Sequence, residues 1–166
     1  MNPAGYWLSE KLDGCRCFLT ESGRMLSRNG RDFRPPAWFT AGLPKGIRLD
    51  GELFAGRGGF DELVSTIQRK GSDWEGITFQ IFDLAQLRQP IENRLAALAR
   101  LSLPPHCQLV PHRVCVGSQD LDATEAAIVA EGGEGVCLRA PESYYRPGNF
   151  WKIKRLFADL NRSVLD

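Results

Sequence analysis

The segment Glu10-Lys11-Leu12-Asp13-Gly14-Cys15-Arg16 decides how the rest of the chain is interpreted. It follows a short apolar start and precedes alternating apolar and polar residues, which predict a strand. A lysine between carboxylates is usually part of a solvated ion-pair cluster. The alternative is a nucleophilic lysine, which must lose its proton before it can attack. Asp13-Gly14 would allow a sharp turn where a phosphate can approach the backbone.

Four further segments carry charged or aromatic residues beside expected strands. Asp50-Gly51-Glu52 lies within an apolar strand, and Glu134-Gly135-Val136 begins another after a glycine pair. Phe79-Gln80-Ile81-Phe82-Asp83 belongs to a continuous apolar run. In Trp151-Lys152-Ile153-Lys154 the alternation places both lysines on one face of a strand. Two carboxylates are suited to Mg²⁺, and two lysines on one face are suited to a phosphate.

The hydrophobic pattern predicts a mixture of strands and helices. Segments 15–20 and 25–27 are typical of a hairpin, and 60–70 and 91–101 have helical spacing. A third helix is expected to open at Asp122-x-x-Glu125, a capping-box pattern, and to stop at Gly132-Gly133. Further strands are expected at 47–55, 77–84, 107–116, 136–139 and 151–156. Because strands and helices do not alternate regularly, the pattern favours an α+β fold with antiparallel sheets.

Length and composition exclude several classes of protein. The 166 residues suffice for one domain. A composition with 43% hydrophobic and 25% charged residues is typical of a soluble globular protein. No apolar run is long enough to span a membrane, and segment 1–7 has no signal-peptide pattern. Free thiols among the five cysteines would favour a reducing, cytoplasmic setting. The five cysteines lack paired zinc-ligand spacing, with His106 and His112 only weak partners, so most are expected to be small core residues.

Charge is unevenly distributed although the net charge is only +1. Segment 16–34 contains five arginines, and segment 139–155 is also basic. Segment 115–137 carries Asp120, Asp122, Glu125, Glu131 and Glu134. Two basic segments and one acidic segment predict a polyanion site on one face.

Taken in order, these motifs resemble those of the covalent nucleotidyltransferases, which include ATP-dependent DNA ligases, RNA ligases and mRNA capping enzymes. Segment 11–16 matches motif I, KxDGxR; segments 50–52, 79–83, 134–136 and 152–154 match motifs III, IIIa, IV and V. Ser9-Glu10-Lys11-Leu12-Asp13-Gly14 and Leu49-Asp50-Gly51-Glu52-Leu53 look most like the minimal bacterial ATP-dependent DNA ligases. The resemblance covers essentially the whole chain.

The resemblance implies two twisted antiparallel sheets with flanking helices, the ATP-grasp-like fold of ligase adenylation domains. It implies that Lys11 attacks the α-phosphate of ATP and carries AMP, and that Phe82 stacks on adenine. The implied residues fall into three groups: nucleotide contacts at Ser9, Glu10, Lys11, Arg16, Glu52, Phe82, Arg139, Lys152 and Lys154; DNA-phosphate contacts at Arg28 and Arg31; and Mg²⁺ ligands at Glu52 and Glu134.

The expected activity is that of a monomeric DNA ligase acting on nicked duplex DNA. AMP would pass from Lys11 to the 5′-phosphate of the nick and leave when the 3′-hydroxyl attacks. Residues 1–166 are expected to be the adenylation domain, without the OB-fold domain that follows it in the family. Ser9 stands where many members carry an acid that helps read adenine. A backbone carbonyl at this position could contact adenine instead, so we expect ATP rather than GTP. An RNA ligase, a capping guanylyltransferase and a non-catalytic nick- or nucleotide-binding module remain alternatives.

Overall fold

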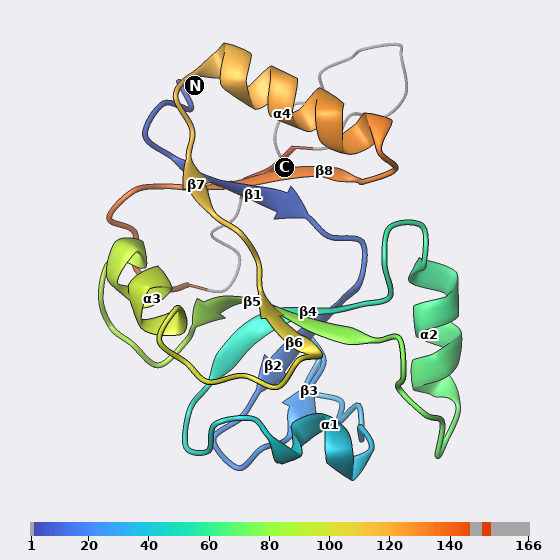
Figure 1. Ribbon diagram of the computed structural model, residues 1–166. Coiled ribbons are helices and arrows are strands. Elements are labelled where there is room, and N and C mark those ends of the chain that lie inside the picture. Colours follow the sequence, from blue (N-terminus) through green and yellow to red (C-terminus); the bar gives the residue numbers. More distant parts are fainter. Residues whose placement is uncertain (1, 147–150, 154–166) are drawn as a thin grey trace.

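Two β-sheets lie one above the other, with helices on their outer sides (Figure 1). The computed structural model describes residues 2–146 and 151–153. The strands are β1 (Trp7–Lys11), β2 (Cys15–Leu19), β3 (Met25–Leu26), β4 (Leu49–Phe54), β5 (Thr78–Leu84), β6 (Cys107–Leu109), β7 (Arg113–Val114), β8 (Gly135–Arg139) and β9 (Trp151–Ile153). The helices are α1 (Ala37–Ala41), α2 (Phe60–Gln68), α3 (Ile91–Leu98) and α4 (Ser118–Ala130).

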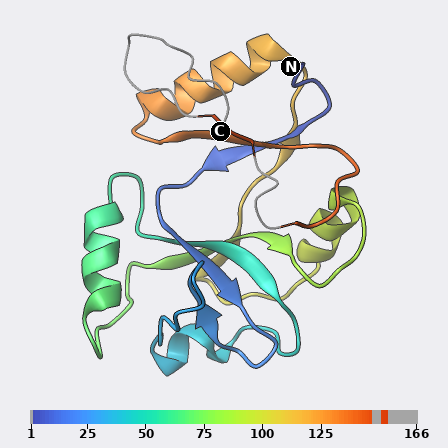
Figure 2. The same ribbon diagram turned by 180° about the vertical axis from the view of Figure 1, so that it is seen from behind.

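One sheet has the strand order β7-β1-β8-β9 and the other β3-β2-β4-β5-β6. Neighbouring strands are antiparallel except β5 and β6, which are parallel. Helix α4 covers the first sheet, and α2 and α3 flank the second on opposite sides (Figures 1 and 2). This arrangement confirms the expected α+β class and its two twisted, largely antiparallel sheets.

The chain crosses between the sheets at two places that matter for the site. Segment 12–14 joins β1 to β2, and segment 110–112 joins β6 to β7. The prediction of one strand over 107–116 is therefore wrong. Pro111 has no N–H to donate to a ladder, and on either side of it β6 pairs with β5 whereas β7 pairs with β1.

Each sheet has its own hydrophobic core. The larger core packs the second sheet against its helices, with Leu49, Leu53, Phe79 and Ile81 all fully buried. The smaller core lies under α4 and comprises Leu8, Cys115, Val136 and Leu138. Of the five cysteines, Cys17, Cys107 and Cys115 are buried, as expected of small core residues, and Cys15 and Cys137 are half-buried.

The helix boundaries differ from the sequence pattern at α4. Asp122 and Glu125 lie inside this helix, which begins four residues before Asp122, so the capping-box prediction is wrong. Asp120 instead accepts a hydrogen bond from the Val116 backbone N–H at 3.0 Å. The predicted end of the helix at Gly132-Gly133 is confirmed, since Gly132 adopts a left-handed φ of 89° just after the helix. Within the described residues, no helix is both long and apolar enough to cross a bilayer.

Candidate active site

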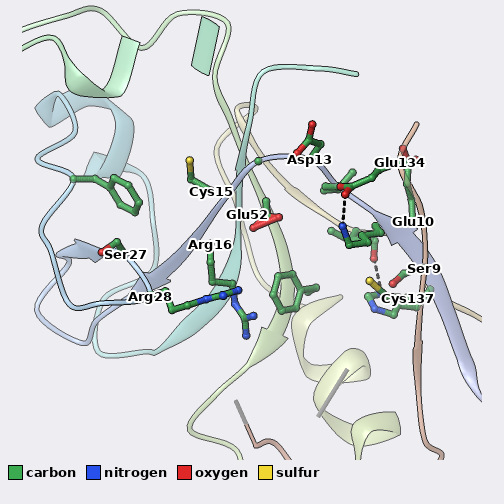
Figure 3. A pocket seen from close by; sticks show the side chains of 17 residues that line it. Ser9, Glu10, Asp13, Cys15, Arg16, Ser27, Arg28, Glu52, Glu134 and Cys137 are labelled. Carbon is green, nitrogen blue, oxygen red and sulfur yellow. Dashed lines mark hydrogen bonds and ion pairs between the residues drawn. The ribbon is translucent and has the colours of Figure 1, made fainter. Parts of the chain in front are cut away.

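A cavity of about 420 Å³ lies between the two sheets, which is within the usual size range of small-ligand pockets. Both inter-sheet segments contribute to it, through Leu12, Asp13 and Gly14 on one side and Val110 and His112 on another. Figure 3 shows Arg16 and Arg28 to one side of Glu52, with Ser9 and Cys137 to the other. The position of the cavity follows from the fold, because it forms where the chain passes from one sheet to the other.

Lys11 and Glu134 form an ion pair inside this cavity (Figure 3). Lys11 ends β1 and lies opposite Gly135 in the β1–β8 pairing, so Glu134 immediately precedes the partner position. Their side chains are only 19% and 14% exposed. The amine is thus held at a fixed point in a partly dehydrated pocket, which is the placement that a nucleophile requires.

The close approach of β1–β2 to β4 depends on Gly14. A Cβ atom at this position would lie 2.0 Å from the carbonyl oxygen of Leu53 and 2.8 Å from Cγ of Glu52. Beyond the turn, Arg16 lies opposite Glu52 in the β2–β4 pairing. The glycine therefore brings the Lys11 strand and the Glu52 strand within reach of a single ligand.

Arg16 is fixed by a bidentate pair with Asp50, at 2.6 Å for both Nε and Nη2. Asp50 is fully buried and also accepts a hydrogen bond from the Tyr145 hydroxyl at 2.8 Å. Burial raises the pKa of Asp50, although the hydrogen bonds from Arg16 and Tyr145 oppose that shift. The Arg16 guanidinium also lies 5.0 Å from the centre of the Phe82 ring, which lines the cavity.

A second buried cluster supports the cavity from behind. Asp83 accepts hydrogen bonds from Arg94 Nε at 2.7 Å and from Arg139 Nη1. Arg139 also donates to the carbonyl of Phe82 at 2.7 Å and to His112 Nε2 at 2.8 Å. Arg139 is 4% exposed and is not among the cavity-lining residues, so it holds Phe82 and His112 in place from outside the cavity.

The carboxylates fit a divalent cation that is also bound to substrate phosphates. Glu52 and Glu134 line the same cavity, and Mg²⁺ commonly takes one or two carboxylates together with phosphate oxygens and water. Over residues 2–146 and 151–153, no group of three or more Asp, Glu, His or Cys side chains is arranged as a metal site.

No family model matches the chain. A DNA ligase from Haemophilus influenzae is 34% identical over 157 residues, which cover 92% of this chain and 58% of that protein. The solved structure of a Lig E DNA ligase is 31% identical with a TM-score of 0.85, covering 93% of this chain and 64% of that one. The chain is therefore similar to DNA ligases in both sequence and fold.

Chlorella virus DNA ligase-adenylate has the same fold, with a TM-score of 0.66 at 20% identity, and covers 90% of this chain and 61% of that one. The chain thus spans between half and two thirds of the length of these relatives. The recognition of the family from its motifs is confirmed.

Most residues expected to bind nucleotide or metal meet in this cavity. Its lining includes Ser9, Glu10, Lys11, Arg16, Glu52 and Phe82, which are expected to contact the nucleotide, and Glu134, which is expected to bind Mg²⁺ with Glu52. Glu10, however, is held by Arg57 through two hydrogen bonds of 3.0 Å. Arg57 also reaches Glu131 at 2.9 Å and so links the loop before α2 to the end of α4.

The remaining expected residues lie at the edge of the cavity or beyond it. Arg28 is exposed and lines the cavity, whereas Arg31 is exposed and lines a neighbouring groove. Lys152 lies in β9 opposite Cys137 of β8. Lys154 lies outside the described residues.

Sequence reasoning missed several residues of this site. Val110, His112 and Cys137 line the cavity, and Tyr145 anchors Asp50. Alternation in β8 could have indicated Cys137, since Val136 and Leu138 on either side of it are buried in the core. His112 carried no such signal, because its place depends on the break at Pro111.

Proposed function

We propose that residues 1–166 form an adenylation domain in which Lys11 becomes covalently linked to AMP. The observation that carries this proposal is the fixed position of Lys11 beside Glu134 in a cavity that Glu52 also lines. The amine nitrogen would attack the α-phosphorus of ATP, lose a proton and form a P–N bond as pyrophosphate leaves. Charged and hydrogen-bonding side chains, including Lys11, Glu52 and Glu134, surround one cavity, which supports an enzyme rather than a passive binding module.

The other residues have roles that follow from their positions. Phe82 offers a ring face in the cavity for adenine, and Arg16 offers a guanidinium beside that ring for the ribose or phosphates. Glu52 and Glu134 would hold Mg²⁺, which when bound would neutralise charge on the phosphates. Lys152 and Lys154 remain proposed contacts to the α-phosphate.

We further propose that the acceptor is the 5′-phosphate of a nick in duplex DNA, sealed afterwards by attack of the 3′-hydroxyl. Arg28 supports this acceptor, because it is exposed at the rim of the cavity. We propose that the protein acts as a monomer. Five free thiols support a reducing, cytoplasmic setting.

The direct test is incubation with α-labelled ATP and Mg²⁺, followed by denaturing electrophoresis. Wild-type protein should retain label that is released by acid and resists base, as a phosphoamide does. Lys11→Ala should retain none, whereas Lys45→Ala, altered at an exposed lysine away from the cavity, should label like wild type. Labelling of Lys11→Ala at the wild-type level would refute the proposal.

A further inference from the structure

An ion pair between Arg57 and Glu10 joins the two sheets next to Lys11. Arg57 lies in the loop between β4 and α2, and Glu10 is the residue of β1 that directly precedes Lys11. The Arg57 guanidinium donates from Nε and Nη2 to the two carboxylate oxygens of Glu10, both at 3.0 Å. Such a bidentate contact fixes orientation as well as distance. The end of β1 is thus tied directly to the loop that follows β4.

Glu10 is the better fixed of the two carboxylates that Arg57 contacts. The side chain of Glu10 is 24% exposed, whereas that of Glu131 is 72% exposed. Ion pairs open to solvent contribute little, so the contact to Glu131 constrains Arg57 only weakly. A Cβ atom at Gly133 would lie 3.0 Å from Oε1 of Glu10, so the missing side chain there leaves room for the carboxylate. Glu10 is therefore the partner through which Arg57 can act on the site.

The Arg57–Glu10 pair lies where the strand pairing of Lys11 ends. Lys11 is the last residue of β1 and lies opposite Gly135, and the chain then leaves for the second sheet. Glu52 lies on β4, in the strand that leads into the Arg57 loop. Figure 1 shows this loop reaching from the second sheet towards the turn between α4 and β8. The distance between the Lys11 and Glu52 backbones therefore depends on this contact between the sheets.

We propose that Arg57 is a positioning residue for the reaction of Lys11 and that it acts through Glu10. The inference rests on the proposed formation of lysyl-AMP, and it gives Glu10 a role other than the nucleotide contact expected from the motifs. Arg57 does not line the cavity, so it acts on the position of the amine and not on the nucleotide. A misplacement of about 1 Å costs up to about 10²-fold in rate, because the amine must approach the phosphorus along one line.

The test is single-turnover labelling by α-labelled ATP over a range of ATP concentrations, which separates the maximal rate from the half-saturating concentration. Arg57→Met keeps the length of the side chain and loses its donors, so the maximal rate should fall about tenfold. The half-saturating concentration should stay within about twofold of wild type, since no contact to the nucleotide is lost. Arg57→Lys keeps the charge without the bidentate geometry and should fall between the two.

A double-mutant cycle tests whether Arg57 acts through Glu10. Glu10→Gln should lower the maximal rate about as much as Arg57→Met, and E10Q/R57M should be no slower than either, because all three lose the same contact. The matched control is Arg113→Met. It breaks a bidentate pair of the same kind, in which Arg113 donates to both oxygens of Asp120 at 2.8 Å, outside the cavity. Arg113→Met should label at the wild-type rate.

Four results would overturn the inference. A wild-type maximal rate in Arg57→Met would show that the pair has no part in positioning Lys11. A raised half-saturating concentration at an unchanged maximal rate would make Arg57 a nucleotide contact. Multiplied losses in E10Q/R57M would show that Arg57 does not act through Glu10, and equal slowing in Arg57→Met and Arg113→Met would attribute the loss to stability. Failure of the proposed function is distinguishable, because the wild-type protein itself would then take no label.

Discussion

His112 accepts a hydrogen bond from Arg139 through Nε2 at 2.8 Å, and this contact fixes the protonation state of its ring. Nδ1 faces the Val110 carbonyl at 2.7 Å, which can only accept. Because Arg139 can only donate, the ring must carry its proton on Nδ1 and stay neutral. Burial and the charge of Arg139 accordingly lower the pKa of His112 from 6.5 to about 4.

This lowered pKa predicts a loss of stability in acid. An unfolded His112 takes up a proton below about pH 6.5, whereas the folded one resists it until about pH 4. The unfolded state therefore binds more protons in this window, and the free energy of unfolding falls as pH drops from 6.5 to 4, by up to roughly 3 kcal/mol.

Urea unfolding at pH 4 and pH 7 measures this loss in wild type and in His112→Gln. The variant should lose up to roughly 3 kcal/mol less over the range, since glutamine does not titrate. His106→Gln serves as the control because His106 is the other histidine of the chain. The same pH dependence in wild type and His112→Gln would contradict the assignment of a neutral, acid-resistant ring.

Removing the charge of Glu134 should slow the formation of lysyl-AMP. Glu134→Gln loses the ion pair to Lys11 and a carboxylate for the cation, so single-turnover labelling should slow on the order of 10²-fold. Glu52→Gln should slow it similarly. Glu131→Gln is the matched control, since Glu131 pairs with Arg57 and does not line the cavity. A Glu134→Gln rate equal to that of Glu131→Gln would show that the ion pair has no part in the reaction.

Adding one methyl group at Gly14 should destabilise the fold. The Cβ of Gly14→Ala would lie 2.0 Å from the Leu53 carbonyl oxygen, a contact that only backbone movement can relieve. We expect a loss of about 3 kcal/mol in the free energy of unfolding, as for an overpacked core. In Gly42→Ala the nearest atom is the Pro104 Cβ at 3.3 Å, so its loss should stay below about 1 kcal/mol. Urea unfolding of both variants and of wild type measures these losses, as shifts of the urea midpoint at an unchanged dependence of the unfolding free energy on urea concentration.

Arg28 should account for recognition of the 5′-phosphate rather than for general affinity. Wild-type protein is expected to bind a 5′-phosphorylated nick more tightly than an unphosphorylated one. In Arg28→Ala the ratio of these two affinities should fall to about 1, because the lost contact exists with only one substrate. Arg100→Ala, changed at an exposed arginine outside the cavity, should keep the wild-type ratio. If Arg28→Ala kept the wild-type ratio of the two affinities, another residue would have to make the contact to the 5′-phosphate.

The sequence predicted the parts of the fold that depend on local pattern. The hairpin at β2–β3, the helical spacing of α2 and α3, and the strand around Glu52 all depend on alternation or helical period within one segment. The pattern does not predict β1, whose burial is irregular: only Leu8 of its five residues is fully buried. The strand forms because it lies between β7 and β8, which belong to the far end of the chain.

The same limit applies to the site. Motif spacing indicated Lys11, Glu52, Phe82 and Glu134, and the structure brings these four around one cavity. It could not indicate that Arg139 pairs with Asp83 behind the cavity, or that Arg57 holds Glu10. Both pairings join residues more than 45 positions apart. An arginine is also well suited to bind phosphate, so its residue type alone does not show that it pairs with a carboxylate.

The order of strands in the two sheets has a consequence for how the protein is made. The sheet β3-β2-β4-β5-β6 uses one uninterrupted stretch, Cys15 to Leu109, and so its partners are present early in synthesis. In the sheet that holds Lys11, the partners of β1 are β7 and β8, which are synthesised much later than β1. Glu134 follows Lys11 by 123 residues. Such distant pairings form slowly. Lys11 therefore meets Glu134 only after β1 has paired with β8, and the AMP labelling proposed for Lys11 would count only the molecules that have formed this pairing.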